Sequence, residues 1–96
     1  MSPINKKKLN LLRIKLDMLD TELLKLIKKR SNLVNKVLKV KIHKKEIIDQ
    51  KRIKFILKKI KKKSIQLKID PKITKSIWEN MIWSFIDYEK RNFKKK

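Results

Sequence analysis

The chain has 96 residues, of which 30 are Lys or Arg and 9 are Asp or Glu, for a formal net charge of +21. This length allows one domain at most, and the absence of cysteine excludes disulfides and cysteine-bound metals. No apolar run is long enough to span a membrane and no secretory signal pattern is evident, so we expect a soluble cytoplasmic protein.

A charge this positive ordinarily indicates a nucleic acid or an anionic membrane as partner. However, the basic residues are overwhelmingly lysine, and the chain is rich in Ile and Asn while lacking Gly and Ala. This composition is typical of A+T-rich codons, so our hypothesis is that codon bias, and not a polyanion, explains the lysines. We therefore predict no nucleic-acid partner, and a balanced G+C content of the gene would contradict the hypothesis. The few arginines then become the more informative basic residues: Arg13, Arg30, Arg52 and Arg91.

The first predicted helix runs from about Lys6 to Ile42 and carries one long apolar row. Such a row is typical of the buried side of a helix bundle or coiled coil. Arg30 stands where the next apolar residue belongs, and a buried guanidinium costs several kcal/mol unless an anion meets it. The row therefore predicts either an internal ion pair or a site for an anionic ligand. Its apolar members are Leu9, Leu12, Leu16, Leu19, Leu23, Leu26, Leu33, Val37 and Val40.

Two shorter helices are predicted to follow. A polar break at residues 43–46, with His43 exposed, precedes a second helix over 47–66. Asp70 suits the N-cap of a third helix and Pro71 its first position, and this helix extends to about Phe93. The prediction is one all-α domain over residues 1–96 with frayed ends at 1–5 and 94–96. The third helix is expected to bury Ile77, Trp78, Met81, Ile82 and Phe85.

Five charged residues are predicted to face one interior: Arg30, Lys41, Asp49, Arg52 and Glu89. Lys41 follows Arg30 by almost three helical turns, roughly 16 Å along the axis, so both project from one face. Internal ion pairs, Arg30 with Glu89 and Arg52 with Asp49, are one interpretation. Three cations against two acids leave an excess of positive charge, which favours an anionic guest.

Arg13 lies beside the apolar row, roughly 25 Å from Arg30 along the same helix. It is too far away to hold the same small ligand within one straight helix. An antiparallel partner helix would bring it there, because the N-terminal part of one chain would lie beside the middle of the other. If Arg13 binds the ligand, the protein is a dimer with shared sites.

The ordered set of these residues resembles the all-helical chorismate mutases, the AroQ class. The resemblance covers about residues 9–90. It rests on Leu12-Arg13, Leu16-Asp17-x-Leu19-Asp20, Leu23-Leu24-x-Leu26-Ile27-x-x-Arg30, Leu33-Val34-x-x-Val37-x-x-x-Lys41, Ile48-Asp49-x-x-Arg52, Ile69-Asp70-Pro71, Ile77-Trp78 and Tyr88-Glu89.

The resemblance implies an intertwined homodimer of three-helix chains that converts chorismate to prephenate without a cofactor, the committed step toward phenylalanine and tyrosine. It implies that Arg13 reaches the site from the partner subunit and binds substrate carboxylate, with Arg30 and Arg52 in the same anion-binding shell. Lys41 would hydrogen-bond the ether oxygen and a carboxylate, and Asp49 would lie near the substrate hydroxyl.

Three positions depart from the family pattern. Ile53 stands where the family commonly has a Glu that binds the substrate hydroxyl, and Phe85 stands where a small hydroxyl residue is common. Glu89 replaces a Gln found in some relatives, and it donates a hydrogen bond to the ether oxygen only when protonated. This predicts activity that falls as pH rises, and a weaker pH dependence for Glu89→Gln.

Three alternatives stay open at the level of sequence. A basic helical nucleic-acid-binding protein explains the charge but not the buried arginines, and no DNA- or RNA-reading motif is present. A coiled-coil assembly module explains the apolar row but not the cluster of Asp49, Arg52 and Glu89. A related lyase acting on isochorismate would use the same cage of cations.

Overall fold

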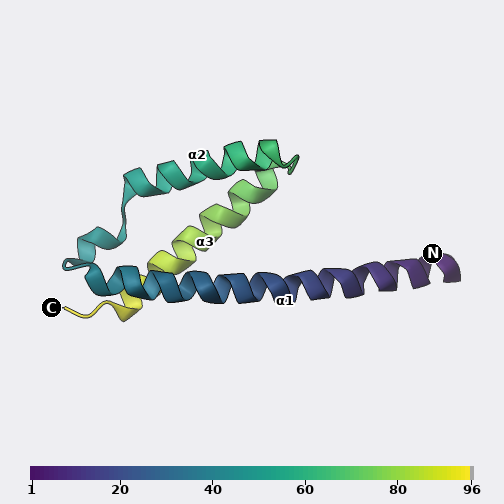
Figure 1. Cartoon of the computed structure of the whole chain (residues 1–96), viewed down its shortest axis with the longest axis horizontal. Coiled ribbons are helices and arrows are strands. Elements are labelled where there is room, and N and C mark those ends of the chain that lie inside the picture. The colour runs from purple at the N-terminus through teal and green to yellow at the C-terminus, as the bar shows by residue number, and fades with distance from the viewer. Residues whose placement is uncertain (96) are drawn as a thin grey trace. The chain divides into compact units, whose positions relative to one another are not determined.

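The computed structural model describes residues 1–95, which form three α-helices and a short 3-10 helix (Figure 1). No strand occurs within this range. The predicted all-α class, with one long and two shorter helices, is confirmed. The elements are α1 (Pro3–Val40), η1 (Lys44–Ile47), α2 (Gln50–Gln66) and α3 (Pro71–Asn92).

Helix α1 begins three residues earlier than predicted because Ser2 caps it. The Ser2 hydroxyl accepts from the backbone N–H of Asn5 at 3.2 Å, and its carbonyl accepts from that of Lys6 at 2.8 Å. Serine at the N-cap followed by Pro3 at the first helical position is a favourable start. The sequence analysis recognised this signal at Asp70-Pro71 and missed it here. The predicted end at Ile42 was also two residues too late.

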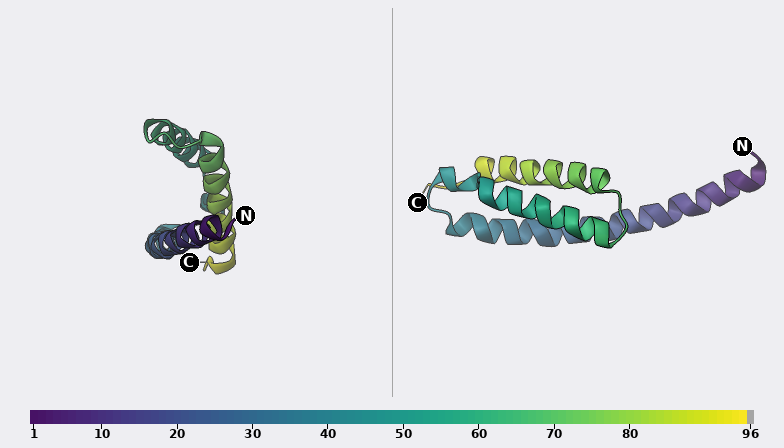
Figure 2. Two further views of the ribbon diagram at one scale, coloured as in Figure 1. Left: turned by 90° about the vertical axis from the view of Figure 1, so that its right-hand side faces the viewer. Right: turned by 90° about the horizontal axis from the view of Figure 1, so that it is seen from above.

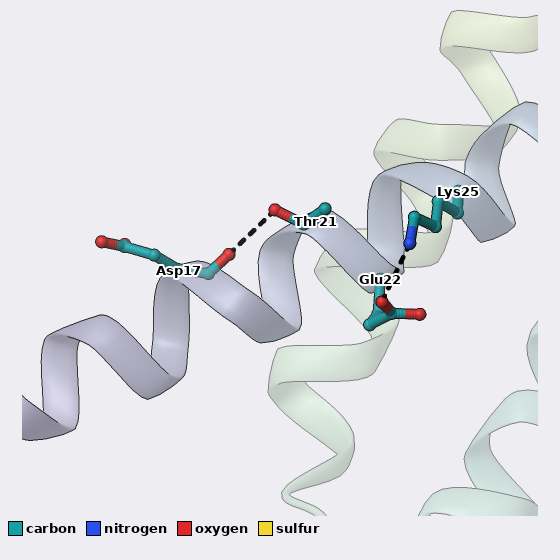
Figure 3. A network of polar contacts seen from close by, with 4 residues as sticks. All are labelled: Asp17, Thr21, Glu22 and Lys25. Carbon is teal, nitrogen blue, oxygen red and sulfur yellow. Dashed lines mark hydrogen bonds and ion pairs between the residues drawn. The ribbon is translucent and has the colours of Figure 1, made fainter.

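Residues Met1–Leu33, the larger part of α1, form the first of two compact units. Its polar face carries local contacts (Figure 3): Thr21 donates to the carbonyl of Asp17 at 3.2 Å, and Lys25 pairs with Glu22 at 3.2 Å. The apolar row is exposed in the single chain. Leu19, for example, exposes 64% of its surface. The same holds for Leu12, Leu16, Leu23, Leu26 and, in the second unit, Val37 and Val40.

The second unit begins at Val34 and contains the end of α1, η1, α2 and α3. Helices α2 and α3 pack against each other as a hairpin, and α3 also packs on η1 (Figure 2). Near the hairpin turn the hydroxyls of Ser64 and Thr74, both buried, lie 2.7 Å apart. This hydrogen bond joins the end of α2 to the beginning of α3.

The turn between α2 and α3 lacks the glycine that usually ends such a helix. Lys68 takes the left-handed conformation, with φ of 58°. The N–H of Ile69 reaches back to the carbonyl of Ser64 at 2.9 Å, and that of Leu67 to Lys63 at 2.9 Å, which satisfies the last carbonyls of α2. Asp70 then caps α3 as predicted, accepting from the N–H of Lys72 at 2.9 Å.

The core of the second unit is formed by Leu38, Ile47, Ile82 and Ile86. The sequence analysis predicted Ile82 but not Ile86. Ile77, expected in the core, is 51% exposed, while Trp78, Met81 and Phe85 are only half-buried. The buried line of α3 is therefore rotated toward Ile82 and Ile86, four residues apart, because α1 contributes Leu38 to this core. Within residues 1–95, no helix is long and apolar enough to cross a membrane.

Candidate active site

Lys41 and Glu89 meet in the second unit, where the chain leaves α1. The ammonium of Lys41 lies 3.0 Å from Oε1 of Glu89, and the two side chains are 17% and 8% exposed. Glu89 continues the buried line of Ile82 and Ile86 on α3. Lys41 follows the last residue of α1, and its N–H donates to the carbonyl of Leu38 at 3.2 Å. The structure thus brings together two of the predicted site residues, in an ion pair that the sequence analysis did not name.

Asp49 is the N-cap of α2 rather than a residue of its helical face. Its side chain accepts from the backbone N–H of Arg52 at 3.0 Å. The sequence analysis began this helix at residue 47, which places Asp49 inside it, and expected Asp49 and Arg52 to face one interior. That prediction was wrong because a short aspartate side chain satisfies the free N–H groups at a helix start. A 3-10 turn, held by the Glu46 carboxylate accepting from the N–H of His43 at 3.2 Å, occupies the preceding residues.

The guanidinium of Arg52 does not form the predicted ion pair with Asp49. It lies 5.5 Å from the centroid of the Phe55 ring, a cation–π distance, and the residue is exposed. Ile53, the next residue, is half-buried and packs against the core. Arg52 and Ile53 therefore point to different surroundings, one toward solvent and one toward the core.

Lys41 and Asp49 line one surface pocket of about 580 Å³, at the junction of η1 and α2. The other lining residues are Glu46, Ile48, Gln50 and Lys51. Two acids and two lysines therefore share this pocket. Within residues 1–95, no three His, Asp or Glu side chains are grouped as a metal site requires.

The remaining predicted site residues lie on α1 and α3. Arg30 is half-buried on α1 in the first unit, and Phe85 is half-buried on α3. Arg13 is exposed on α1. His43 is exposed just after α1, as predicted.

One polar contact beside Glu89 was missed by the sequence analysis. The hydroxyl of Tyr88 donates to Oδ1 of Asn35 at 2.7 Å, and both residues are half-buried. Asn35 lies between Val34 and Lys36 on α1, outside the apolar row, so periodicity gave no reason to single it out. An asparagine at a half-buried helix position is nonetheless a signal, because a buried amide requires a partner.

Comparison with models of protein families shows to which family the chain belongs. The model of the family described as chorismate mutase type II matches residues 12–90. The chain belongs to the chorismate mutase type II family. This confirms the resemblance seen in the sequence and indicates chorismate mutase activity, an isomerisation. Neither a curated protein nor a solved structure matches the chain.

Proposed function

We propose that this member of the chorismate mutase type II family converts chorismate to prephenate, in the route to phenylalanine and tyrosine, with Lys41 as the central catalytic residue. The observation that carries the proposal is the ion pair, at 3.0 Å, between the half-buried Lys41 and the buried Glu89. An ammonium has three N–H donors. One is directed at Glu89, and two are left for a ligand.

The reaction requires neither a nucleophile nor a metal. It is a concerted rearrangement in which the C–O bond of the ether breaks while a new C–C bond forms in the same molecule. A catalyst must hold the flexible dianion in a compact reactive shape, which fixed cations achieve by binding both carboxylates. It must also stabilise the negative charge that develops on the ether oxygen. Lys41 supplies a donor for that oxygen. Glu89, which the sequence analysis expected to donate to the same oxygen when protonated, is here proposed to keep the ammonium in place as its ion-pair partner.

The other residues of the family pattern complete the proposed cage. Arg30 and Arg52 bind substrate carboxylates, and the exposed Arg52 would leave the ring of Phe55 to do so. Asp49 lies near the substrate hydroxyl, in the same pocket as Lys41. Ile53 and Phe85 take the positions at which relatives commonly have polar contacts to the substrate.

A second copy of the chain is part of the proposal, because the exposed apolar row of α1 needs a partner surface. Leu12, Leu16 and Leu23 each expose more than half of their surface. Burial of one leucine side chain stabilises a contact by about 1.5–3 kcal/mol. An antiparallel copy of α1 would cover this row and would bring the partner's Arg13 toward Lys41.

The test is loss of chorismate absorbance with the purified full-length chain and three variants. Lys41→Met keeps the aliphatic length but removes the charge, and it is expected to lower kcat/KM by about 10²–10³-fold, as loss of a transition-state donor does. Arg30→Ala is expected to raise KM as well as lower kcat. Lys36→Met is the matched control, since Lys36 is an exposed lysine of α1, and its activity is expected to equal that of the wild type.

Equal activity of Lys41→Met and wild type would refute the assigned role of Lys41. Absence of any chorismate turnover would refute the mutase proposal itself. Pyruvate release from isochorismate would then favour the lyase, and DNA binding that weakens steeply with salt would favour the nucleic-acid-binding alternative.

A further inference from the structure

Two side-chain bonds tie the end of α1 to the end of α3 within the second unit. One is the Lys41–Glu89 ion pair at 3.0 Å, and the other is the hydrogen bond from Tyr88 to Asn35 at 2.7 Å. Tyr88 and Glu89 are adjacent on α3, so their side chains leave the helix about 100° apart. The two bonds therefore connect neighbouring faces of α3 to Asn35 and Lys41, which are six residues apart in the chain.

A core residue of α1 lies between the two bonds in the chain. Leu38, which lies between Asn35 and Lys41 in the chain, is 8% exposed and packs in the cluster that contains Ile86. Asn35, Leu38 and Tyr88 also line one surface pocket together. Apolar packing of this kind resists separation of the helices but directs sliding and rotation only weakly, because it is non-directional.

A hydrogen bond is directional, so it can fix the sliding and rotation of two helices that apolar packing restrains only weakly. The Tyr88 hydroxyl has a rigid ring behind it, and the guanidinium of Arg91 lies 6.0 Å from the centroid of that ring. Asn35 sits on a regular turn of α1, so a slide of α3 by one residue, about 1.5 Å, would stretch and bend this bond and weaken it. Loss of this bond would leave the half-buried amide of Asn35 without its partner, which is costly.

We propose that Tyr88 and Asn35 are positioning residues that set the register of α3 against α1 and so hold Glu89 at Lys41. The inference rests on the proposed function, because it concerns where the Lys41 ammonium stands when substrate is bound. A misplacement of about 1 Å at a catalytic group is enough to slow a reaction greatly. The phenol and the amide do not contact the reacting atoms in this scheme.

The experiment compares Tyr88→Phe with Thr74→Val in the full chain. Each removes one interhelical hydrogen bond of 2.7 Å, but Thr74 lies near the opposite end of α3, about 22 Å along the axis from Glu89. Tyr88→Phe is expected to lower kcat roughly tenfold with KM changed less than twofold, because register affects the transition state more than ground-state binding. Thr74→Val is expected to lower the urea midpoint while kcat stays within twofold of wild type.

A second measurement does not depend on activity. The ¹⁵N signal of the Lys41 ammonium, followed by NMR, is expected to shift or broaden in Tyr88→Phe and to stay unchanged in Thr74→Val. If Tyr88→Phe fails to fold, Asn35→Ala and Asn35→Asp replace it. The alanine is expected to reproduce the loss of kcat, and the aspartate, which keeps an oxygen acceptor, is expected to restore kcat to within twofold of wild type.

The inference is overturned if Tyr88→Phe keeps wild-type kcat and an unshifted Lys41 signal. It is also overturned if Thr74→Val lowers kcat as much as Tyr88→Phe, because the effect would then be one of general stability. A wild-type chain without mutase activity would refute the proposed function alone, and the Lys41 signal would still decide whether Tyr88 controls the ion pair.

Discussion

Replacing Lys41 with methionine is expected to lower the free energy of unfolding by about 3 kcal/mol, through what happens to Glu89. The variant keeps the length of the side chain but leaves the Glu89 carboxylate, whose side chain is 8% exposed, without its ammonium. Removal of one partner from a buried ion pair typically costs 3–5 kcal/mol because a buried charge is left uncompensated. The 17% exposure of Lys41 shows some access to water, which favours the lower end of that range.

The direct attraction between the two charges is of the same order. Two unit charges 3.0 Å apart attract each other by about 5–6 kcal/mol at an effective dielectric constant of about 20. Much of this is offset by the cost of removing both groups from water. The double variant Lys41→Met/Glu89→Leu loses both the attraction and this cost, so its stability is expected to lie within about 1 kcal/mol of wild type.

Urea unfolding followed by circular dichroism would measure these differences. Several protein concentrations are needed because the proposed self-association would also stabilise the folded chain. Lys25→Met is the matched control, since it breaks the Lys25–Glu22 pair at 3.2 Å, in which both side chains are about two-thirds exposed. That loss is expected to stay below about 0.5 kcal/mol. The reasoning is refuted if Lys41→Met costs no more than Lys25→Met, or if the double variant is as unstable as Lys41→Met.

Three further predictions concern other parts of the chain. Leu19→Lys is expected to weaken self-association roughly 10³-fold in sedimentation equilibrium, because about 2 kcal/mol of apolar burial is lost in each of two protomers; an unchanged dissociation constant would remove α1 from the interface. Ile53→Glu is expected to lower KM for chorismate roughly tenfold, because the carboxylate adds a hydrogen-bond acceptor for the substrate hydroxyl. It is also expected to lower the free energy of unfolding by about 1–3 kcal/mol, because the position is half-buried. An increase in KM would contradict the expected gain in binding. Lys68→Gly is expected to raise the free energy of unfolding by about 0.5–1 kcal/mol without changing kcat, because glycine adopts a φ of 58° at no steric cost. A destabilised variant would contradict the idea that Lys68 is sterically strained.

The local patterns of the sequence were sufficient for the elements themselves. Apolar spacing predicted three helices, and Asp70 with Pro71 fixed the start of α3 to the residue. The same patterns placed Lys41 and Glu89 toward the interior, where the structure has them nearly buried. The order of charged residues along the chain was also enough to indicate the chorismate mutase type II family, because a resemblance of that kind depends on spacing and not on contacts.

Helix capping limited what the helical period of the sequence could predict. A helical period assigns a residue to a face, but it does not distinguish a residue inside the first turn from the cap that precedes it. Asp49 was therefore placed inside the second helix, although its side chain caps that helix by accepting from the backbone N–H of Arg52. The guanidinium of Arg52 accordingly lies over Phe55 and not against that carboxylate.

The sequence by itself determined that the chain forms three α-helices and that Lys41 and Glu89 face inward, since helical periodicity depends on residues three or four apart. Only the tertiary structure decided which polar side chains contact each other between helices. Glu89 meets Lys41 at a separation of 48 positions in the chain, and Tyr88 meets Asn35 at a separation of 53. Such contacts depend on how one helix rotates and slides against another. Contacts between residues far apart in the chain decide this, and no local pattern encodes it.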